Sequence, residues 1–454
     1  TFTSLHHATR SATRYAAVSF GLDAALLALA FAFAPLDWEV GVDRAPVALT
    51  LATAGLVGLF LAGGYRLTQP VRLAPARLAP LGLSLGIALA WLVLKLAFQK
   101  ARIYDLNPPA LEGFVPTVLA LAALTALHRA LHLRALHRAE AARPVFLLAD
   151  PSTATSLIAR LRARGFTGEV REVDATQLQA LGTRPPPGTA PTAPPRAIVL
   201  ARPLSSLARP ELEALAVTRA SGLPVSSAAR FEEDLFGYTP LRTPDDPWLL
   251  MDEALVRRAP LYLGAKRLLD LILTVLALPL ALPLVLACAV VVRLTSRGPA
   301  FYRQTRAGLH RRPFSLWKLR TMVADAEAAT GPVFAGQDDP RVTRLGRFLR
   351  RSRLDELPQL WNVLIGDMSL VGPRPERPEL DHLLAPEIPF YALRHLVRPG
   401  LTGWAQVHLG YGASTEDAFR KLEHDVYYLK RASFSFDLAI LVRTVPVVLG
   451  LRGR

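Results

Sequence analysis

Long apolar runs separated by charged segments dominate the first third of the chain. A helix needs about 20 apolar residues to cross the roughly 30 Å hydrocarbon core of a bilayer. Four runs approach that length, and they occupy residues 15–34, 45–62, 78–98 and 114–127. Unbalanced basic residues precede the first run, separate the second from the third and follow the fourth. Under the positive-inside rule this alternation predicts a four-helix transmembrane bundle with both ends in the cytoplasm.

Two other interpretations of these runs are less economical. Four buried helices of a soluble domain would not need such long runs or such an alternation of loop charge. A cleaved signal peptide would need a small-residue cleavage site after the first run, and the pattern lacks one. We therefore expect the first run to be a retained helix.

Residues 144–240 alternate short apolar segments with amphipathic ones. Strands are predicted at 144–149, 168–173 and 197–201, and helices at 153–164 and 210–221. Such alternation predicts a small doubly wound α/β sheet. The first strand is followed by residues 150–154 (DPSTA), where a dinucleotide site would need glycine for the pyrophosphate to approach the backbone. We expect a degenerate Rossmann-like domain, with residues 184–196 as a proline-rich loop.

A fifth apolar run spans residues 268–292 and contains Pro279 and Pro283. Proline inside a helix removes a hydrogen bond and kinks it. Basic residues flank the run at both ends, which disagrees with a simple crossing. We predict a re-entrant membrane helix that breaks at Pro283 and returns to the same face. The alternative is an ordinary kinked transmembrane helix. Near the C-terminus, residues 436–449 predict an interfacial helix.

Composition narrows the class of protein. The 454 residues are 51% hydrophobic, with a mean hydropathy of +0.27 and a net charge of +16. A chain this apolar is not a single soluble domain. Anionic lipid, nucleic acid or phosphorylated substrates would all suit the charge, and the apolar runs favour a membrane surface over nucleic acid. Cys288 is the single cysteine, which excludes a disulfide framework and a cysteine-based zinc site.

The most informative stretch places two adjacent carboxylates, Asp355 and Glu356, between arginines and a Pro-Arg-Pro turn at 373–375. Leu357, Leu360, Trp361 and Leu364 have the spacing of one helix face. Pro358 is tolerated only in a first turn, so this helix is predicted to start at about Asp355. A helix N-terminus attracts anions such as phosphate. The alternative is that Asp355 only caps the helix and the arginines are its solvated counter-ions.

From residue 266 onward an ordered series of motifs covers about 190 residues. It comprises 266–270 (KRLLD), 298–308 (GPAFYRQTRAG), 317–322 (WKLRTM), 353–359 (RLDELPQ), 366–375 (GDMSLVGPRP) and 398–407 (RPGLTGWAQV). This series resembles the bacterial sugar transferase family, the monotopic phosphoglycosyl transferases. With the preceding segments, the chain is similar to the long-form undecaprenyl-phosphate galactose or glucose phosphotransferases.

The resemblance implies three domains and an activity. Residues 1–143 would form the four-helix transmembrane domain, 144–250 the Rossmann-like domain and 251–454 a mostly α catalytic domain containing the re-entrant helix. The enzyme would transfer a sugar 1-phosphate from UDP-galactose or UDP-glucose to undecaprenyl phosphate and release UMP. This is the first membrane step of exopolysaccharide, capsule or O-antigen synthesis. We expect a multi-pass protein of the bacterial cytoplasmic membrane, with its active site on the cytoplasmic face and a homodimer as one possible assembly.

The resemblance also assigns roles to residues. Asp355 would attack the β-phosphate and form a covalent intermediate, and Glu356 would help to bind Mg²⁺ or handle a proton; both are the expected metal ligands. Substrate phosphate would be bound by Arg350, Arg374, Lys318 and Arg320. A carboxylate can attack phosphorus when cations neutralise the phosphoryl oxygens. For Lys318 and Arg320, a salt bridge to Asp338, Asp339 or another acid is an equally open role.

One departure from the family pattern concerns the re-entrant helix. Leu282 stands where serine usually precedes the proline, and Pro279 is an extra proline. Tyr411, Tyr427 and Tyr428 are candidates for stacking on a base or sugar, although core packing is the simpler role. Two rival functions remain: the same transfer by direct displacement, and a nucleotide-binding membrane sensor or scaffold with an inactive transferase domain. The intact Asp355-Glu356 pair disfavours the latter.

Overall fold

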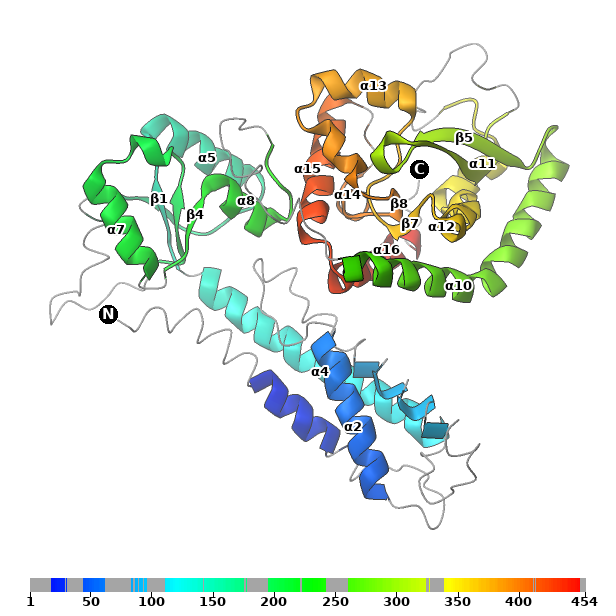
Figure 1. The fold of residues 1–454 in the computed structure, drawn as a ribbon, viewed down its shortest axis with the longest axis horizontal. Coiled ribbons are helices and arrows are strands. Elements are labelled where there is room, and N and C mark those ends of the chain that lie inside the picture. The colour runs from blue at the N-terminus through cyan, green and yellow to red at the C-terminus, as the bar shows by residue number, and fades with distance from the viewer. Residues whose placement is uncertain are drawn as a thin grey trace. The chain divides into compact units, whose positions relative to one another are not determined.

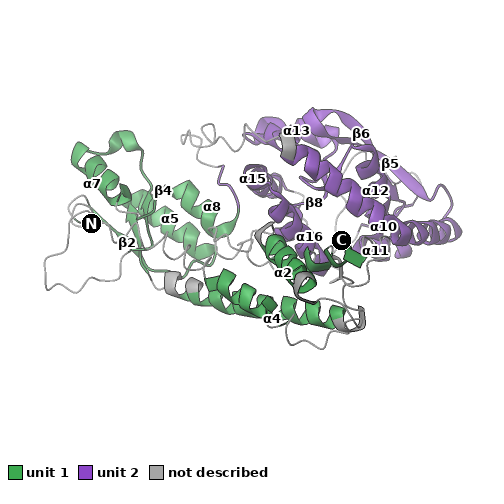
Figure 2. Ribbon diagram, turned by 60° about the horizontal axis from the view of Figure 1, so that its bottom comes forward, with its two compact units in different colours: residues 1–237 green, residues 238–454 purple. Residues whose placement is uncertain are grey.

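The computed structural model describes residues 18–28, 30, 44–61, 83–84, 86–88, 90–92, 94–95, 111–141, 143–174, 177, 195–220, 223–241, 260–323, 326, 339–410, 412 and 414–449. The chain divides into two compact units, Thr1–Gly237 and Tyr238–Arg454 (Figure 2). The predicted boundary at residue 250, residues 184–194 of the proline-rich loop, Asp338 and Tyr411 lie outside the described residues.

Each of the four N-terminal apolar runs contains helix. Helical residues occur at Val18–Ala28, α2 (Arg44–Leu61), several positions within 83–95, and α4 (Leu111–Ala141) (Figure 1). Within the described chain, Phe114–Ala135 and Tyr262–Thr295 are long and apolar enough to cross a membrane by length and composition, whereas Val18–Ala28 and Val47–Leu59 are shorter. The run that is shortest in the sequence thus lies in a helix of 31 residues, because alanine, leucine and arginine continue the helix beyond the apolar stretch.

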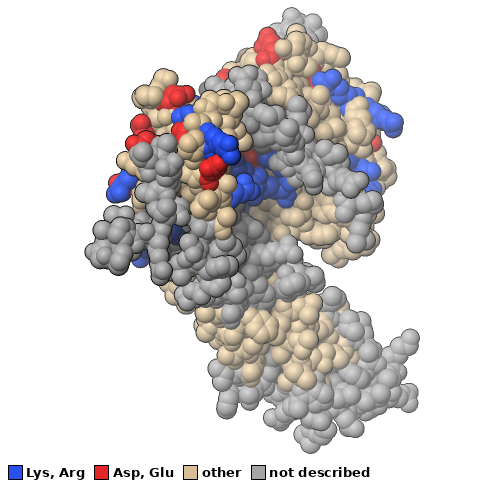
Figure 3. All heavy atoms as spheres, turned by 60° about the vertical axis from the view of Figure 1, so that its left-hand side comes forward, with Lys and Arg blue, Asp and Glu red and all other residues tan. Residues whose placement is uncertain are grey.

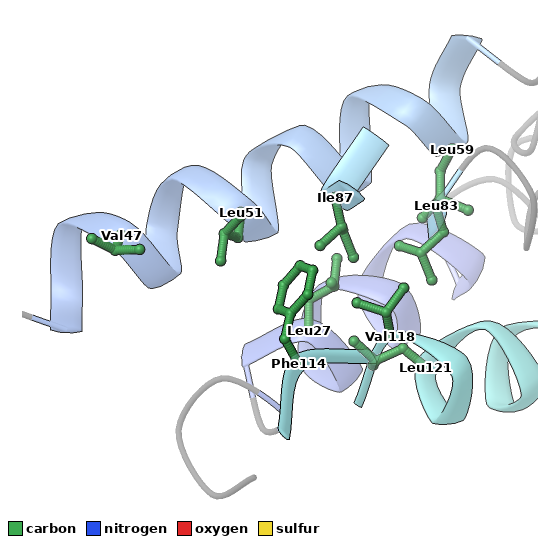
Figure 4. Packing of buried hydrophobic residues seen from close by; sticks show 9 residues of the cluster. All are labelled: Leu27, Val47, Leu51, Leu59, Leu83, Ile87, Phe114, Val118 and Leu121. Atoms are coloured by element: carbon green, nitrogen blue, oxygen red, sulfur yellow. The ribbon is translucent and has the colours of Figure 1, made fainter. Parts of the chain in front are cut away.

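Side chains from all four helical segments meet in one apolar cluster (Figure 4). Its buried members are Leu27, Val47, Leu51, Leu59, Leu83, Ile87, Phe114, Val118 and Leu121. On the face that Figure 3 draws, the described atoms in the lower part of the picture are neither basic nor acidic, and the exposed side chains of these helices include Leu49, Leu119 and Leu127. An apolar cluster inside an apolar exterior is expected of helices that face lipid. The prediction of four crossings remains a prediction.

A buried ion pair joins the first of these helices to α4. Arg129 donates to Asp23, and both side chains are 1% exposed. In the sequence Arg129 counted among the basic residues that follow the fourth run. In the structure Arg129 lies within α4, because the helix continues beyond the apolar run, and it pairs across the helices. Buried charges in such a segment need a partner because unpaired ones are costly.

The α/β part of the first unit is a four-stranded parallel sheet. Its order is β2-β1-β3-β4, formed by β1 (Val145–Leu148), β2 (Val170–Glu172), β3 (Ala197–Leu200) and β4 (Val225–Ser227). α5 (Pro151–Ala163) and α8 (Ala228–Phe236) cover one face, and α7 (Arg209–Ala220) covers the other. A short 3₁₀ helix, η4 (Leu204–Ser206), precedes α7. The predicted small doubly wound sheet is confirmed, and β4 with α8 was not predicted.

Along β3 successive residues serve opposite faces. Ala197 and Val199 pack with α5 and α8, while Ile198 packs with Leu215 of α7. This two-sided burial explains why the strand is a continuous apolar run rather than an alternating one.

The second unit begins with α10 (Pro260–Thr295), one helix of 36 residues that contains Pro279 and Pro283. Figure 1 shows it as two limbs that meet at a bend. Its middle carries exposed leucines, including Leu276 at 71% and Leu280 at 79%. Proline is the usual cause of such a bend. The helix bends without an interruption of its helical structure.

Both ends of α10 are attached to the same unit. Near its start, Arg267 donates to the carbonyl oxygens of Val363 (2.5 Å) and Leu364 (2.7 Å). Near its end, Arg320 donates to the carbonyl oxygens of Ser296 (2.8 Å) and Arg297 (2.6 Å). The first two carbonyls lie at the C-terminal end of α12 and the other two directly after the last residue of α10, where the regular hydrogen bonds of a helix interior end.

The rest of the second unit is mostly helical around two small sheets. β5 (Phe301–Ala307) and β6 (Pro313–Leu319) form an antiparallel hairpin with η6 (Leu309–Arg311) at its turn, and β7 (Ser369–Val371) pairs in parallel with β8 (Gly400–Thr402). The helices are α11 (Arg344–Arg351), η7 (Leu354–Gln359), α12 (Leu360–Ile365), α13 (Pro378–Glu387), η8 (Tyr391–Leu396), α14 (Trp404–His408), α15 (Thr415–Arg431) and α16 (Phe434–Leu449). The helix expected at 436–449 is confirmed, and its interfacial position remains a prediction.

Gly346 lets α11 pack directly on backbone. A Cβ atom at Gly346 would lie 2.0 Å from the carbonyl oxygen of Thr321, whereas a Cβ at Gly264 in α10 would meet nothing within 4 Å. We expect Gly346→Ala to destabilise the second unit by about 1–3 kcal/mol, as overpacking does. Gly264→Ala is the matched control, since alanine favours helix over glycine. Melting in detergent should show a lower temperature for Gly346→Ala only, and equal melting temperatures would contradict this packing.

Candidate active site

The two adjacent carboxylates lie at the start of a helical segment, as predicted. Asp355 and Glu356 belong to η7, and the segment becomes α-helical at Leu360. The N-cap position is occupied by Arg353, in the left-handed conformation (φ 59°) and without a side-chain cap. The alternative that Asp355 is the N-cap is therefore wrong. Both carboxylate residues are 7% exposed.

The predicted apolar face of this helix is only partly correct. Leu360 is buried (7% exposed), but Trp361 is 56% exposed. The change from 3₁₀ to α geometry at Leu360 breaks the single period that the sequence pattern assumed. Asn362, which is fully buried, takes a place on the inner side instead.

Asn362 attaches this helix to the β5–β6 hairpin. Its side-chain oxygen accepts from Trp317 N (3.1 Å) and its amide donates to Ser315 O (2.8 Å). Because both partners lie on β6, the amide pair sets the position of η7 along that strand. Lys318, the next residue on β6, is thereby brought to Glu356.

Glu356 is held by three cations. Its Oε1 accepts from Arg374 Nη2 (2.6 Å) and Lys318 Nζ (3.2 Å), and its Oε2 accepts from Arg353 Nη1 (3.3 Å). Burial alone would raise the pKa of Glu356, but the charges of Arg374, Lys318 and Arg353 outweigh it and lower that pKa well below its usual range. Glu356 is therefore ionised at any ordinary pH.

Asp355 differs from Glu356 both in its contacts and in the direction in which its pKa shifts. Within the part of the chain that the structure describes, its carboxylate makes no hydrogen bond and no ion pair. Burial and the charge of Glu356 raise the pKa of Asp355 to about 6, against the opposing charges of Lys318, Arg350 and Arg374. Adjacent carboxyl groups whose pKa values are pushed apart are typical of sites where one of them reacts.

Arg350 is held beside Asp355 from α11. Its Nε donates to the hydroxyl of Thr321 (2.9 Å). Burial lowers the pKa of Arg350, and the negative charge of Asp355 is the strongest opposing influence. Three of the four predicted phosphate-binding cations, Lys318, Arg350 and Arg374, thus surround the carboxylate pair.

Arg320 is not part of this group. Its guanidinium donates to the carbonyl oxygens at the end of α10 and to the hydroxyl of Ser296 (2.7 Å). The alternative salt bridge to Asp339 is absent too, because Asp339 pairs with Arg341 (2.6 Å). The phosphate-binding role of Arg320 has no support in these contacts.

Two residues near the carboxylates were not singled out from the sequence. Arg353 contacts Glu356, and the three-residue spacing of the pair on one helical turn was an available signal. Thr321 holds Arg350, and no local signal identifies a partner 29 positions away. Tyr427 and Tyr428 are 2% and 1% exposed and pack in the core, which agrees with the simpler of their two predicted roles.

The carboxylate pair fits Mg²⁺ only in part. Magnesium sites often use one or two carboxylates together with substrate phosphates and water. Asp355 has oxygens available for such a site, whereas each oxygen of Glu356 already accepts from a cation. No group of three or more potential metal-ligating side chains occurs among the described residues. Asp355 thus fits an ion shared with substrate, and Glu356 fits one only if its ion pairs rearrange.

Comparisons with known proteins match the part of the chain that carries this site. A profile described as bacterial sugar transferase matches residues 261–451. A UDP-glucose:undecaprenyl-phosphate glucose-1-phosphate transferase from Caulobacter vibrioides is 47% identical over 186 residues, which are 40% of this chain and 69% of that protein. This chain belongs to the bacterial sugar transferase family.

Two further relatives are longer than the shared region. A UDP-N-acetylgalactosamine-undecaprenyl-phosphate N-acetylgalactosaminephosphotransferase from Aeromonas hydrophila is 47% identical over 191 residues, 42% of this chain and 45% of that protein. A UDP-glucose:undecaprenyl-phosphate glucose-1-phosphate transferase from Xanthomonas campestris pv. campestris is 44% identical over 198 residues, 43% of this chain and 41% of that protein. The match therefore spans less than half of the length of these two relatives.

The sugar transferase motifs divide between the site and its support. Lys318, Asp355, Glu356 and Arg374 meet at the carboxylate pair. The first motif instead supports the fold, since Arg267 contacts α12. Membership of the family, together with α10 and α4, makes this chain a membrane protein of mixed α/β structure.

The pKa of Asp355 is raised and that of Glu356 is lowered, so ionisation of the two carboxyl groups has opposite effects on the stability of the fold. The pKa of Asp355 is about 6 in the folded chain and about 3.9 when unfolded. Its ionisation therefore costs stability, by about 2–3 kcal/mol, once the pH has risen through 6. Glu356 has a lowered pKa, so its ionised form stabilises the fold at neutral pH.

We expect Asp355→Asn to raise the melting temperature at pH 7.5, with the gain shrinking as the pH falls through 6 and disappearing at about pH 3, where Asp355 is mostly protonated in both states. Glu356→Gln is the matched variant and should lower the melting temperature at pH 7.5, because it leaves three cations unpaired. Melting curves across this pH range in detergent measure both. Equal shifts of the same sign would show that the two carboxyl groups do not differ.

Proposed function

We propose that this chain transfers a sugar 1-phosphate from a UDP-sugar to undecaprenyl phosphate, giving undecaprenyl-diphosphate sugar and UMP. The observation that carries the proposal is the carboxylate pair. The Glu356 carboxylate accepts hydrogen bonds from three cationic side chains, whereas the Asp355 carboxylate makes no hydrogen bond and no ion pair within the described chain. Three relatives in the family are named as enzymes that transfer a sugar phosphate to undecaprenyl phosphate.

Asp355 is the proposed nucleophile. Its Oδ attacks the β-phosphorus of the UDP-sugar, the bond from that phosphorus to the bridging oxygen breaks, and UMP leaves. A phosphate oxygen of undecaprenyl phosphate then attacks the same phosphorus and releases the Asp355 carboxylate. With a pKa of about 6, Asp355 is mostly ionised at neutral pH, and a desolvated carboxylate without hydrogen bonds is a stronger nucleophile than a paired one.

The cations supply the charge stabilisation. Phosphoryl transfer depends mainly on positioning and on neutralising the equatorial oxygens. Arg374, Lys318 and Arg350 would share their charge between Glu356 and the substrate phosphates. The Arg374 side chain is 39% exposed, so it has room to contact substrate while bonded to Glu356. Arg320 would hold the residues that follow α10 in place rather than bind substrate phosphate.

Mg²⁺ is the proposed cofactor. It would be held by Asp355 and, after rearrangement of its ion pairs, by Glu356, together with oxygens of the substrate. When bound, the ion would neutralise charge on the diphosphate.

A membrane arrangement follows from the same reaction, because its lipid substrate lies in the bilayer and its nucleotide substrate in the cytoplasm. We propose that the four N-terminal helical segments cross the cytoplasmic membrane and that α10 is re-entrant, bent at Pro283. Both ends of α10 bond to one unit. A crossing helix would carry its far end about 30 Å away.

The remaining proposals concern the whole chain. We divide it into the transmembrane domain 1–143, the Rossmann-like domain 144–250 and the catalytic domain 251–454. Glucose and N-acetylgalactosamine occur in the names of the relatives, so N-acetylgalactosamine joins galactose and glucose as a candidate sugar. The product would begin assembly of a surface polysaccharide.

The proposed activity predicts UMP release that requires three components. Purified protein should release UMP from a UDP-sugar only when undecaprenyl phosphate and Mg²⁺ are both present. A panel of UDP-glucose, UDP-galactose and UDP-N-acetylgalactosamine identifies the sugar, and EDTA should abolish release. Absence of UMP with every sugar would reject the proposal, and full activity in EDTA would reject the cofactor.

The covalent route predicts capture of labelled sugar phosphate. Without the lipid acceptor, wild-type protein and UDP-[¹⁴C]sugar should give labelled protein, at a rate that rises as the pH passes about 6. Asp355→Asn should give no labelled protein and no turnover, although it folds. Turnover by the wild type without any captured label would favour direct displacement, and turnover by Asp355→Asn would remove its nucleophilic role.

The re-entrant arrangement predicts that both ends of α10 are on the cytoplasmic side. Single cysteines at Gly264 and Thr295, in a Cys288→Ser background, should react with an impermeant thiol reagent only after spheroplasts are lysed. Glu39→Cys, in the segment predicted to lie outside, is the control that should react before lysis. Labelling of Thr295→Cys from outside, with Gly264→Cys protected, would indicate a crossing helix.

A further inference from the structure

The loop that carries Arg374 is held through its carbonyl groups. Pro373 and Pro375 flank Arg374 and have no N–H to donate. The carbonyl oxygens of residues 373–376 each accept from a different place, in order from Gly400 N (2.8 Å), Arg394 Nη2 (3.0 Å), Arg306 Nη1 (3.1 Å) and Ala307 N (2.9 Å). The carbonyl of Arg374 itself is the one held by the side chain of Arg394.

The guanidinium of Arg394 is held by contacts with Tyr391 and Asp425. The residue is 5% exposed and lies on η8. Its Nη1 donates to the hydroxyl of Tyr391 (2.8 Å), and its Nη2 is 3.1 Å from a carboxylate oxygen of Asp425 on α15. Its guanidinium also lies 5.2 Å from the centre of the Tyr391 ring. A guanidinium with planar, fixed donors transmits such constraints better than a flexible amine would.

The carbonyl that Arg394 holds belongs to Arg374, whose side chain reaches the carboxylate pair. The peptide group that Arg394 holds follows the Cα atom from which the Arg374 side chain leaves. That side chain reaches Glu356 at 2.6 Å. A shift of about 1 Å in a charged group can cost about 100-fold in rate when a reaction depends on positioning.

We propose that Arg394, oriented by Asp425 and Tyr391, is a positioning residue that fixes Arg374 for binding the substrate diphosphate. Arg394 does not touch substrate, and it acts through the Arg374 carbonyl. This inference rests on the proposed phosphotransfer. It gives a role to a buried arginine–aspartate pair outside the carboxylate site.

A double-mutant cycle tests the proposal. Arg394→Lys keeps the charge beside Asp425 but loses the planar pair of donors, and Arg374→Ala removes the group that is positioned. In the wild-type background Arg394→Lys should lower kcat/KM by about 10–100-fold. In the Arg374→Ala background it should change kcat/KM by less than about 2-fold, because coupled residues are non-additive. The same cycle read on the dissociation constant of UDP needs no turnover and should show the same pattern.

Two further variants separate positioning from general stability. Arg398→Lys alters another arginine-to-carbonyl contact, to Gly366 O (3.0 Å), and should leave kcat/KM within about 2-fold. If Arg394→Lys does not fold, Tyr391→Phe removes only the hydroxyl that orients Arg394 and replaces it in the cycle. Equal losses in both backgrounds, or no loss in the wild-type background, would overturn the positioning role. A wild-type chain that releases no UMP would instead overturn the proposed function.

Discussion

The site depends on one constraint, which is that two neighbouring carboxylates are buried together. Two adjacent negative charges in a region of low dielectric repel each other and lose hydration. Three cations from different segments compensate Glu356. That compensation is not shared equally, because no cation bonds to Asp355 within the described residues. The result is a pair in which Glu356 is ion-paired and Asp355 has a pKa of about 6.

Neighbouring elements hold the cations around Glu356 in place. β6 supplies Lys318, and Asn362 sets the alignment of β6 with the carboxylate helix. The left-handed conformation of Arg353 has a cost for a residue with a side chain. It accompanies a turn at which the Arg353 guanidinium reaches Glu356. Elements far apart along the chain are therefore held in place by polar contacts that also define the site.

In the proposed arrangement the bent helix α10 holds this site at the lipid surface. Its exposed leucines would be unfavourable in water, yet each of its ends is bonded to the rest of the second unit. Lys266 pairs with Asp437 (2.8 Å), and Arg267 bonds to α12. These basic residues also counted as evidence for topology from the sequence, and the structure gives them a second task. A residue can satisfy the positive-inside pattern and still be required for packing.

The sequence alone was sufficient for the elements whose signals are local. Apolar runs predicted helix in the four N-terminal segments, in α10 with both of its prolines and in α16, and buried apolar segments predicted three strands of the parallel sheet. The adjacent Asp355 and Glu356, with arginines close by, located the site. These features depend on neighbours within a few positions, where periodicity and backbone chemistry carry the information.

Only the tertiary structure decided which groups pair. Lys318 and Arg320 belong to one motif, two residues apart, yet Lys318 bonds to Glu356 and Arg320 to the end of α10. Asp355 and Glu356 are adjacent and chemically alike, yet their pKa values shift in opposite directions. Pairing and burial of charge depend on segments 18 and 38 positions away from Glu356. Local sequence patterns do not encode such distances, because they arise only when the chain has packed and water has been excluded.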